Sequence, residues 1–139
     1  MTDSIYPGLD LGLEIRSVHH QRLGETVLLW GGDSLDAFAV CHLGEDTEAG
    51  AGSCYVKFAV ARPGPGAERV FDLVLDACET LAHQHGLGRM EAGVNLNRSR
   101  AYRTMLGRGF RAVMYGVAMH RNDSPAYNRP DVYIADDLR

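Results

Sequence analysis

The sequence predicts a mixed α/β fold, and three observations lead to this prediction. The chain has 139 residues, 45% of them apolar and 23% charged, which fits one globular domain over residues 1–139. Two early apolar runs are separated only by a Gly-Gly-Asp turn, as in an antiparallel hairpin. Later apolar runs alternate with segments of helical periodicity, which indicates crossover connections between strands.

The first predicted element is a helix. Residues 1–8 are polar and rich in turn formers, so we expect them to be mobile. Leu11, Ile15 and Val18 then recur at helical spacing, and Gly24 is expected to end this helix.

A hairpin and a strong third strand follow. Residues 26–30 and 37–43 are the hairpin strands, and the glycine-rich acidic stretch 44–52 is an exposed loop. Residues 53–61 are the strongest strand signal in the chain. The prolines of residues 62–66 end this strand, because proline cannot donate to a sheet ladder.

The second half of the chain alternates helices and strands. A long helix is predicted over residues 67–85, with one apolar stripe formed by Val70, Val74, Ala77 and Leu81. A strand over 89–95, a helix over 99–106 and a long strand over 110–120 come next. A short strand over 131–135 completes the prediction.

Charge and cysteine usage exclude several classes of function. The net charge of −4 gives no overall field for nucleic acid or an anionic membrane, and no apolar run approaches the ~20 residues of a membrane span. Cys41, Cys54 and Cys78 have no metal-ligand spacing and each lies in an apolar run, so we expect buried free thiols and no metal. The start lacks a secretory signal, so a cytoplasmic location is expected.

Two segments carry a resemblance to a known family. The segment VKFAVARPGPGAERVFDLVLDACETLAHQHGLGRMEAGVN, residues 56–95, resembles the fourth strand, cofactor loop, third helix and fifth strand of the GNAT family of N-acetyltransferases. The segment NRSRAYRTMLGRGF, residues 97–110, resembles the helix that follows in that family. The resemblance implies a mostly antiparallel central sheet flanked by helices, without the family's first strand and first helix.

The resemblance further implies acetyl-coenzyme A as the co-substrate, lying where the fourth and fifth strands separate. Strand backbone would hold the pantetheine arm, and the loop onto the long helix would hold the pyrophosphate at a helix N-terminus. Asn97 would bind the cofactor or cap the next helix, and the arginines that follow would attract the 3′-phosphate. The residues assigned to the cofactor are Phe58, Ala59, Val60, Arg62, Gly64, Gly66, Ala67, Glu68, Arg69, Asn97, Arg98 and Arg100.

The loop departs from the family's usual motif. Counted from Val60 without gaps, the motif positions fall on Pro65, Glu68 and Val70, and none of these residues matches. Moving the motif to residues 62–67 recovers an arginine and small residues but shifts the register. The alternative interpretation is an ordinary turn between a strand and a helix.

Catalysis would require a base for the amine and an acid for the leaving thiolate. The family's acid position falls on Met105, so Tyr102, one helical turn earlier, is the candidate acid or else a packing residue. Glu91 is the candidate base, with histidines as alternatives. These histidines are His19, His20, His42 and His120.

We therefore expect an acetyl-coenzyme A-dependent N-acetyltransferase that acts on a small-molecule or peptide amine. The alternative is a catalytically degenerate domain of the same fold that binds a ligand or partner. A sheet without its first strand has an unpaired edge, which proteins usually cover. This edge predicts a homodimer or contact with a further domain.

Overall fold

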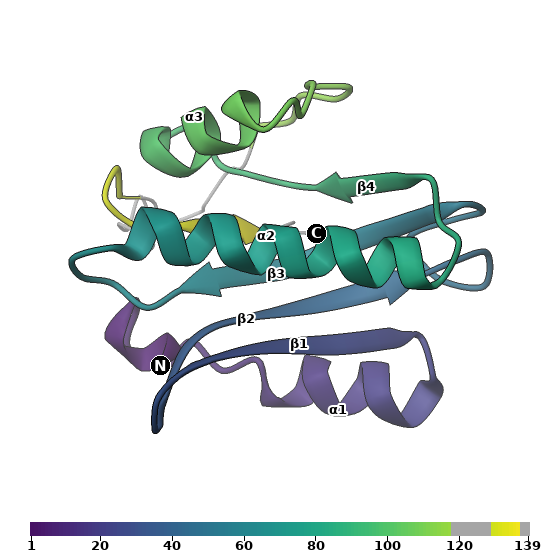
Figure 1. The fold of residues 1–139 in the computed structure, drawn as a ribbon, viewed down its shortest axis with the longest axis horizontal. Coiled ribbons are helices and arrows are strands. Elements are labelled where there is room, and N and C mark those ends of the chain that lie inside the picture. The colour runs from purple at the N-terminus through teal and green to yellow at the C-terminus, as the bar shows by residue number, and fades with distance from the viewer. Residues whose placement is uncertain (118–128, 137–139) are drawn as a thin grey trace.

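The protein is described by a computed structural model over residues 1–117 and 129–136. Figure 1 shows a central sheet with helices packed against it. The elements in chain order are η1 (Thr2–Ser4), α1 (Gly12–Gln21), β1 (Gly24–Gly31), β2 (Ser34–Leu43), β3 (Ser53–Ala61), α2 (Ala67–Gln84), β4 (Arg89–Ala92), α3 (Ser99–Gly107) and β5 (Ile134–Asp136).

The sheet has five strands, and β3 contacts three of the others. β1, β2 and β3 pair antiparallel in chain order. The other side of β3 is shared: β4 runs parallel to Ser53–Val56, and β5 runs antiparallel to Phe58–Val60. The fold is therefore α/β with a mostly antiparallel sheet.

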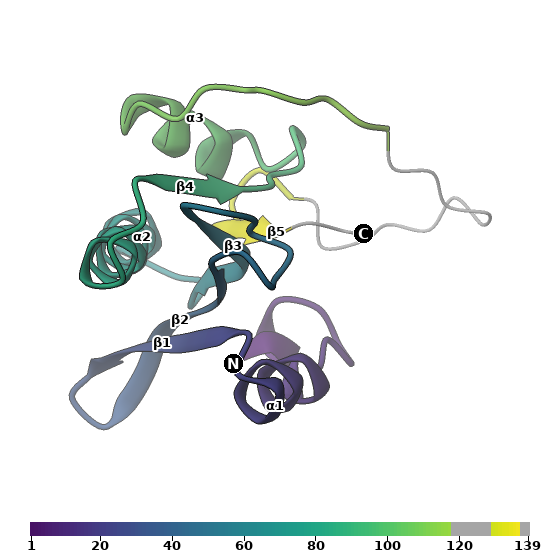
Figure 2. The ribbon, with the colours of Figure 1, turned by 90° about the vertical axis from the view of Figure 1, so that its right-hand side faces the viewer.

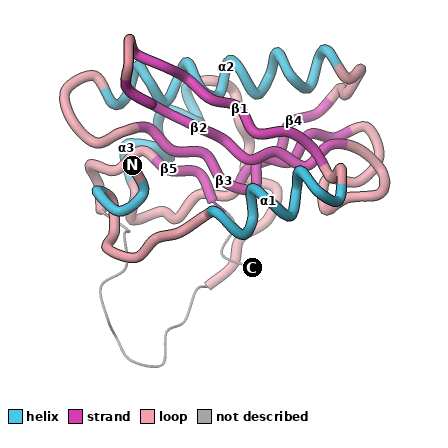
Figure 3. Tube along the Cα trace, turned by 90° about the horizontal axis from the view of Figure 1, so that it is seen from below, coloured by secondary structure: helices cyan, strands magenta, loops and turns pink. Residues whose placement is uncertain are grey.

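The two faces of the sheet bury separate cores. α2 covers one face and α1 the other, as two further views show (Figure 2; Figure 3). Alternate residues of β2 supply both cores, as strand geometry requires. Ala39 and Cys41 face α2, whereas Phe38 and Val40 face the side of α1.

β3 contains a bulge at Lys57. Val40 of β2 pairs with Phe58 and Cys41 pairs with Val56, so Lys57 has no partner in β2. A bulge bends a strand and increases its local twist. This bend falls where the pairing of β3 with β4 ends and its pairing with β5 begins.

The end of α1 differs from the prediction. Arg22, not Gly24, follows the helix in the left-handed conformation, with φ of 56°. Gly24 begins β1, where a Cβ atom would lie 1.9 Å from the carbonyl oxygen of Cys41. The glycine is needed for this close strand approach and does not terminate the helix.

The predicted hairpin and long helix are confirmed with small shifts in their ends. β4 is shorter than predicted, because only Arg89–Ala92 pair with β3, and the last strand lies at Ile134–Asp136. The strand predicted over 110–120 is wrong over residues 110–117, which form no ladder, and residues 118–120 lie outside the described part. Its β-forming sequence pairs with no described strand, and Val113 is 89% exposed.

Residues 1–9 pack on the face of the sheet that α1 covers, although residues 1–8 were expected to be mobile. Ile5 is buried in the core of this face, and Met1 and Leu9 pack around it. The prediction of mobility rests on the polar composition of residues 1–8 and does not consider that Ile5 could anchor the segment.

Candidate functional site

The candidate cofactor edge of β3 is paired with the end of the chain. The register places Phe58 opposite Asp136, Ala59 opposite Ala135 and Val60 opposite Ile134. The Ala61 N–H donates to the carbonyl oxygen of Tyr133 at 3.1 Å, and the Asp136 N–H donates to that of Gly93 at 2.9 Å. The backbone assigned to the pantetheine arm is therefore occupied by β5 in this structure.

Arg98 lies at the same place, fully buried. Its Nη1 donates to Asp136 Oδ1 at 2.6 Å and its Nη2 to Asp136 Oδ2 at 3.0 Å. Nη1 also lies 3.3 Å from the carbonyl oxygen of Ile134. The sequence assigned Arg98 to a cofactor phosphate, but its guanidinium binds the carboxylate of Asp136 and is closed to solvent.

The loop between β3 and α2 takes its shape from two glycines. Gly64 has φ of 141° and Gly66 has φ of 84°, values that side chains rarely allow. Arg62 donates from Nε and Nη2 to the carbonyl oxygen of Leu35, at 3.1 and 2.6 Å, and so ties the loop to β2. Arg69, in the first turn of α2, is exposed and makes no hydrogen bond or ion pair with a described residue.

A second polar group lies at the start of α2. The Thr104 hydroxyl donates to Glu68 at 3.3 Å, from α3 to α2. Tyr133, which packs on Phe71 with ring centroids 5.8 Å apart, lies near Glu68 and Arg100. Burial and the charge of Glu68 raise the pKa of Tyr133, and the charge of Arg100 only partly offsets this effect.

The helix start at α3 differs from the prediction for Asn97. The N-cap residue is Arg98, and it makes no side-chain cap hydrogen bond. The Asn97 N–H instead donates to the side-chain oxygen of Asn95 at 3.0 Å. Asn95 thus forms a local turn before α3, and Asn97 does not cap the helix as expected.

The two candidate catalytic residues lie on different elements, Tyr102 on α3 and Glu91 on β4. Tyr102 is half-buried on α3, where Met105 is buried one turn later. Glu91 lies on β4 opposite Tyr55 and pairs with Arg89, with Oε1 2.8 Å from Nε. Its register position is three residues before Phe58, which corresponds to about 10 Å along the strand.

His42 belongs to a polar cluster between α1 and the sheet. It is 2% exposed, and among the described residues neither ring nitrogen has a hydrogen-bond partner. Its Nε2 lies 3.5 Å from Glu14 Oε1, and Lys57 Nζ lies 3.6 Å from the same oxygen and 2.6 Å from Glu48. Burial lowers the pKa of Lys57, but the hydrogen bond to Glu48 and the charge of Glu14 together raise it. Because the His42 side chain is buried, an amine substrate cannot reach it.

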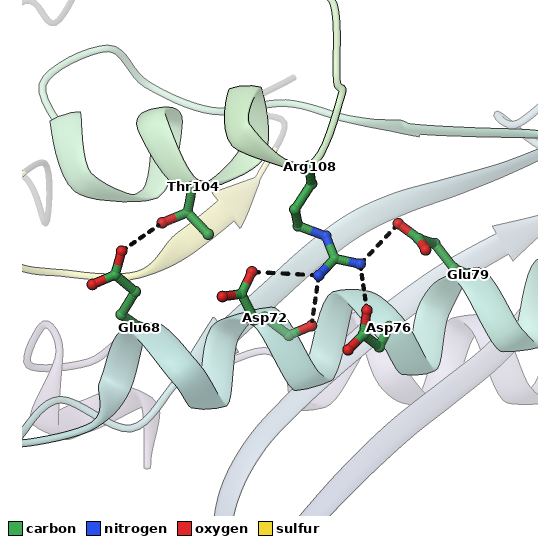
Figure 4. Close-up of polar contacts among 6 residues, drawn as sticks. All are labelled: Glu68, Asp72, Asp76, Glu79, Thr104 and Arg108. Atoms are coloured by element: carbon green, nitrogen blue, oxygen red, sulfur yellow. Dashed lines mark hydrogen bonds and ion pairs between the residues drawn. The ribbon is translucent and has the colours of Figure 1, made fainter.

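The end of α3 carries a surface ion-pair network (Figure 4). Arg108 reaches across to α2, where Nη2 lies 2.5 Å from Asp76 and 2.9 Å from Glu79. Its Nη1 lies 3.3 Å from Asp72. Arg108, one of the clustered arginines of residues 98–111, therefore fastens α3 to α2.

The three cysteines form a buried thiol cluster in the core under α2. The Sγ atoms of Cys41 and Cys78 lie 3.7 Å apart, and all three thiols are free. The hydrogen bond to Cys54 lowers the pKa of Cys41, but the hydrogen bond to Cys78 and burial outweigh it and raise the pKa. The hydrogen bond to Cys41 and burial raise the pKa of Cys54. The protonated state is favoured in both, which argues against thiol nucleophiles.

A separate cleft of about 670 Å³ opens where α1, β1 and α2 meet. It contains the predicted pair His19 and His20. Its lining residues are His19, His20, Arg22, Gly24, Glu25, Leu43 and His85. Gly24 and Leu43 lie at the ends of β1 and β2 that are remote from β5, so the cleft is distinct from the β3 edge.

Among residues 1–117 and 129–136, no group of three or more His, Cys, Asp or Glu side chains is arranged to hold a metal ion. The helices within these ranges are too short or too polar to cross a membrane. No protein-family model, curated protein or solved structure matches the chain. The likeness to the acetyltransferases therefore stands on the two segments described above.

Sequence reasoning missed β5 as a partner of β3, and with it the role of Asp136. The continuous apolar run Val132 to Ala135 is typical of a strand buried on both faces, which was the available signal. Nothing in the sequence linked Asp136 to Arg98, which lies 38 positions earlier.

Proposed function

We propose that the chain is an N-acetyltransferase domain of the GNAT type, which uses acetyl-coenzyme A and acts on a small-molecule or peptide amine. The observation that carries the proposal is the change of partner along β3. Its first half pairs in parallel with β4, and at the Lys57 bulge the two strands stop pairing. A parallel pair that separates at a bulge supplies the strand edge that the pantetheine arm needs.

The loop after β3 supports the same proposal. Gly64 and Gly66 expose the backbone before α2, whose N-terminal N–H groups and dipole favour a phosphate. Arg69 is the free cation of this first turn, whereas Arg62 is already engaged with Leu35. Glu68 opposes an anion, so Arg69 is the residue whose loss weakens cofactor binding most.

The occupied edge of β3 favours a second candidate function, a domain of the same fold that binds a ligand or partner without acetyl transfer. In this form the pantetheine edge is paired with β5 and Arg98 is unavailable to phosphate. The absence of a tyrosine at position 105 and the separation of Glu91 from Phe58 agree with it.

Calorimetric titration with acetyl-coenzyme A distinguishes the two candidates. We expect micromolar binding by the wild type and about tenfold weaker binding by Arg69→Ala, which corresponds to about 1.4 kcal/mol for one lost phosphate contact. Arg16→Ala is the matched control, because Arg16 is an exposed arginine of α1, on the opposite face of the sheet from α2. Folded wild type that binds no cofactor would exclude the acetyltransferase and leave the second candidate.

We also propose a homodimer or a contact with a further domain, in the cytoplasm. Within the described ranges β1 pairs only with β2, and Leu28 and Trp30 on this strand are 49% and 62% exposed. Free buried thiols agree with a reducing compartment. Light scattering that finds a monomer at all concentrations would exclude the homodimer.

A further inference from the structure

The short strand β5 occupies the backbone that the proposed cofactor requires. β2 pairs with one side of Phe58, Ala59 and Val60, and β5 pairs with the other side. A ligand that hydrogen-bonds along this edge and β5 compete for the same backbone groups. We propose that β5 is an autoinhibitory strand, held in place by the Arg98–Asp136 ion pair, which leaves β3 before acetyl-coenzyme A binds.

This inference rests on the proposed function and adds its regulation. The sheet tolerates the departure of β5, because among the described strands β5 pairs only with β3, over three residues, and Asp136 adds one backbone hydrogen bond to Gly93. The ladders between β1, β2 and β3 and the parallel pair of β3 with β4 do not involve it. Opening therefore leaves a four-stranded sheet.

Apolar burial holds β5 in the closed position. Tyr133 and Ala135 belong to the core under α2, while Val132 and Ile134 belong to the core on the side of α1. Because the segment is buried on both faces, its departure exposes both cores at once, and β5 therefore has two states in this proposal, closed and open. The closed state is favoured without a ligand.

The Arg98–Asp136 pair acts as the latch. Two parallel N–H to oxygen contacts of 2.6 and 3.0 Å fix the end of β5 to the start of α3. Neither charge is exposed, so a partial opening would leave a buried charge without its partner. Weakening this contact raises the population of the open state, and apparent ligand affinity rises in proportion.

A reversible crosslink tests the competition directly. Val60 and Ile134 lie opposite each other in the register. Ala61 and Tyr133, the next pair along the ladder, are joined by a backbone hydrogen bond. Because hydrogen-bonded and non-hydrogen-bonded pairs alternate, Val60 and Ile134 form a non-hydrogen-bonded pair with Cα atoms about 4.5 Å apart. This separation suits a disulfide. Both positions face the core without native cysteines, since Cys41, Cys54 and Cys78 lie under α2.

We expect Val60→Cys with Ile134→Cys to bind acetyl-coenzyme A only when reduced, with at least about a tenfold loss of affinity on oxidation. The same protein before and after reduction is the matched control for the changed side chains. In wild type, hydrogen exchange should show that the ligand lowers protection of residues 132–136 and leaves the Ser53–Val56 ladder protected. Asp136→Asn, which keeps the side-chain volume, should bind about tenfold more tightly than wild type.

Three results would overturn the inference in different ways. Equal binding by the oxidised and reduced double variant places the cofactor away from β5 and leaves the acetyltransferase proposal standing. Wild-type binding with unchanged protection of residues 132–136 does the same. No binding by the reduced variant or by Asp136→Asn, when exchange shows that β5 has opened, removes the proposed function and this inference together. If Asp136→Asn does not fold, the disulfide crosslink and hydrogen exchange in wild type still test the inference.

Discussion

The two ends of α3 are both fastened by arginine, but in opposite environments. Arg98, at the N-cap, is fully buried and binds the carboxylate of Asp136 from β5. Arg108, at the C-cap, is partly exposed and shares three carboxylates of α2 (Figure 4). The first contact has no access to water, whereas the partners of the second are largely solvated.

The comparison teaches that the number of ion pairs does not rank their effect. A buried charge that loses its partner carries a large desolvation penalty, while an exposed pair is screened and contributes little. The buried pair of Arg98 with Asp136 should therefore matter more than the three contacts of Arg108. The four predictions that follow test this difference, from the largest expected effect to the smallest.

Arg98→Ala should destabilise the fold by about 3–5 kcal/mol, because Asp136 would be left buried without its counter-charge. Urea unfolding followed by circular dichroism measures the change. Arg103→Ala, an exposed position of the same helix, should stay within about 0.5 kcal/mol of wild type. Equal losses in the two variants would contradict the comparison.

Removing both charges should cost less than removing one. Arg98→Met with Asp136→Leu replaces the pair by apolar side chains, and we expect a stability about 2–4 kcal/mol above that of Arg98→Ala. The same urea titration measures it. A double variant as unstable as the single variant would show that the two hydrogen bonds, not the unpaired charge, dominate.

Arg108→Ala should lower stability by only about 1 kcal/mol in low salt. The loss comes from like-charge repulsion among Asp72, Asp76 and Glu79, which lie three and four residues apart on α2. Unfolding in low and in 1 M NaCl tests this cause, since salt should shrink the difference from wild type. A difference that does not change with salt would indicate lost packing instead.

The smallest effect on stability is expected at alkaline pH, from Tyr133, which precedes β5 in the chain. Its pKa is raised above the ordinary 10.0, so the fold favours the neutral phenol. This stabilisation is complete below pH 10 and is lost as the pH rises through the raised pKa. Thermal melts from pH 8 to 11 should fall more steeply for wild type than for Tyr133→Phe, and identical slopes would contradict the shift.

Much of the fold was predictable from local pattern, and the candidate site was not. The β1–β2 hairpin and α2 follow from turn chemistry and helical spacing, which short stretches of sequence contain. The burial of Arg98 depends on a strand far along the chain, and no local signal contains such a partner. Residues 110–117 have the sequence of a strand but pair with no described strand, so pattern alone misassigned them.

The bulge in β3 fixes the phase of that strand. Cys54 and Val56 face α2, and Ala59 faces it too, only because Lys57 inserts one extra residue between them. Deletion of Lys57 alone would leave a regular ladder with Val56 and Phe58 on their present faces, whereas deletion of Tyr55 would either reverse the face of Cys54 or bring Lys57 into the ladder. For this strand, therefore, loss of one codon should be tolerated far better at the bulge than one or two positions before it.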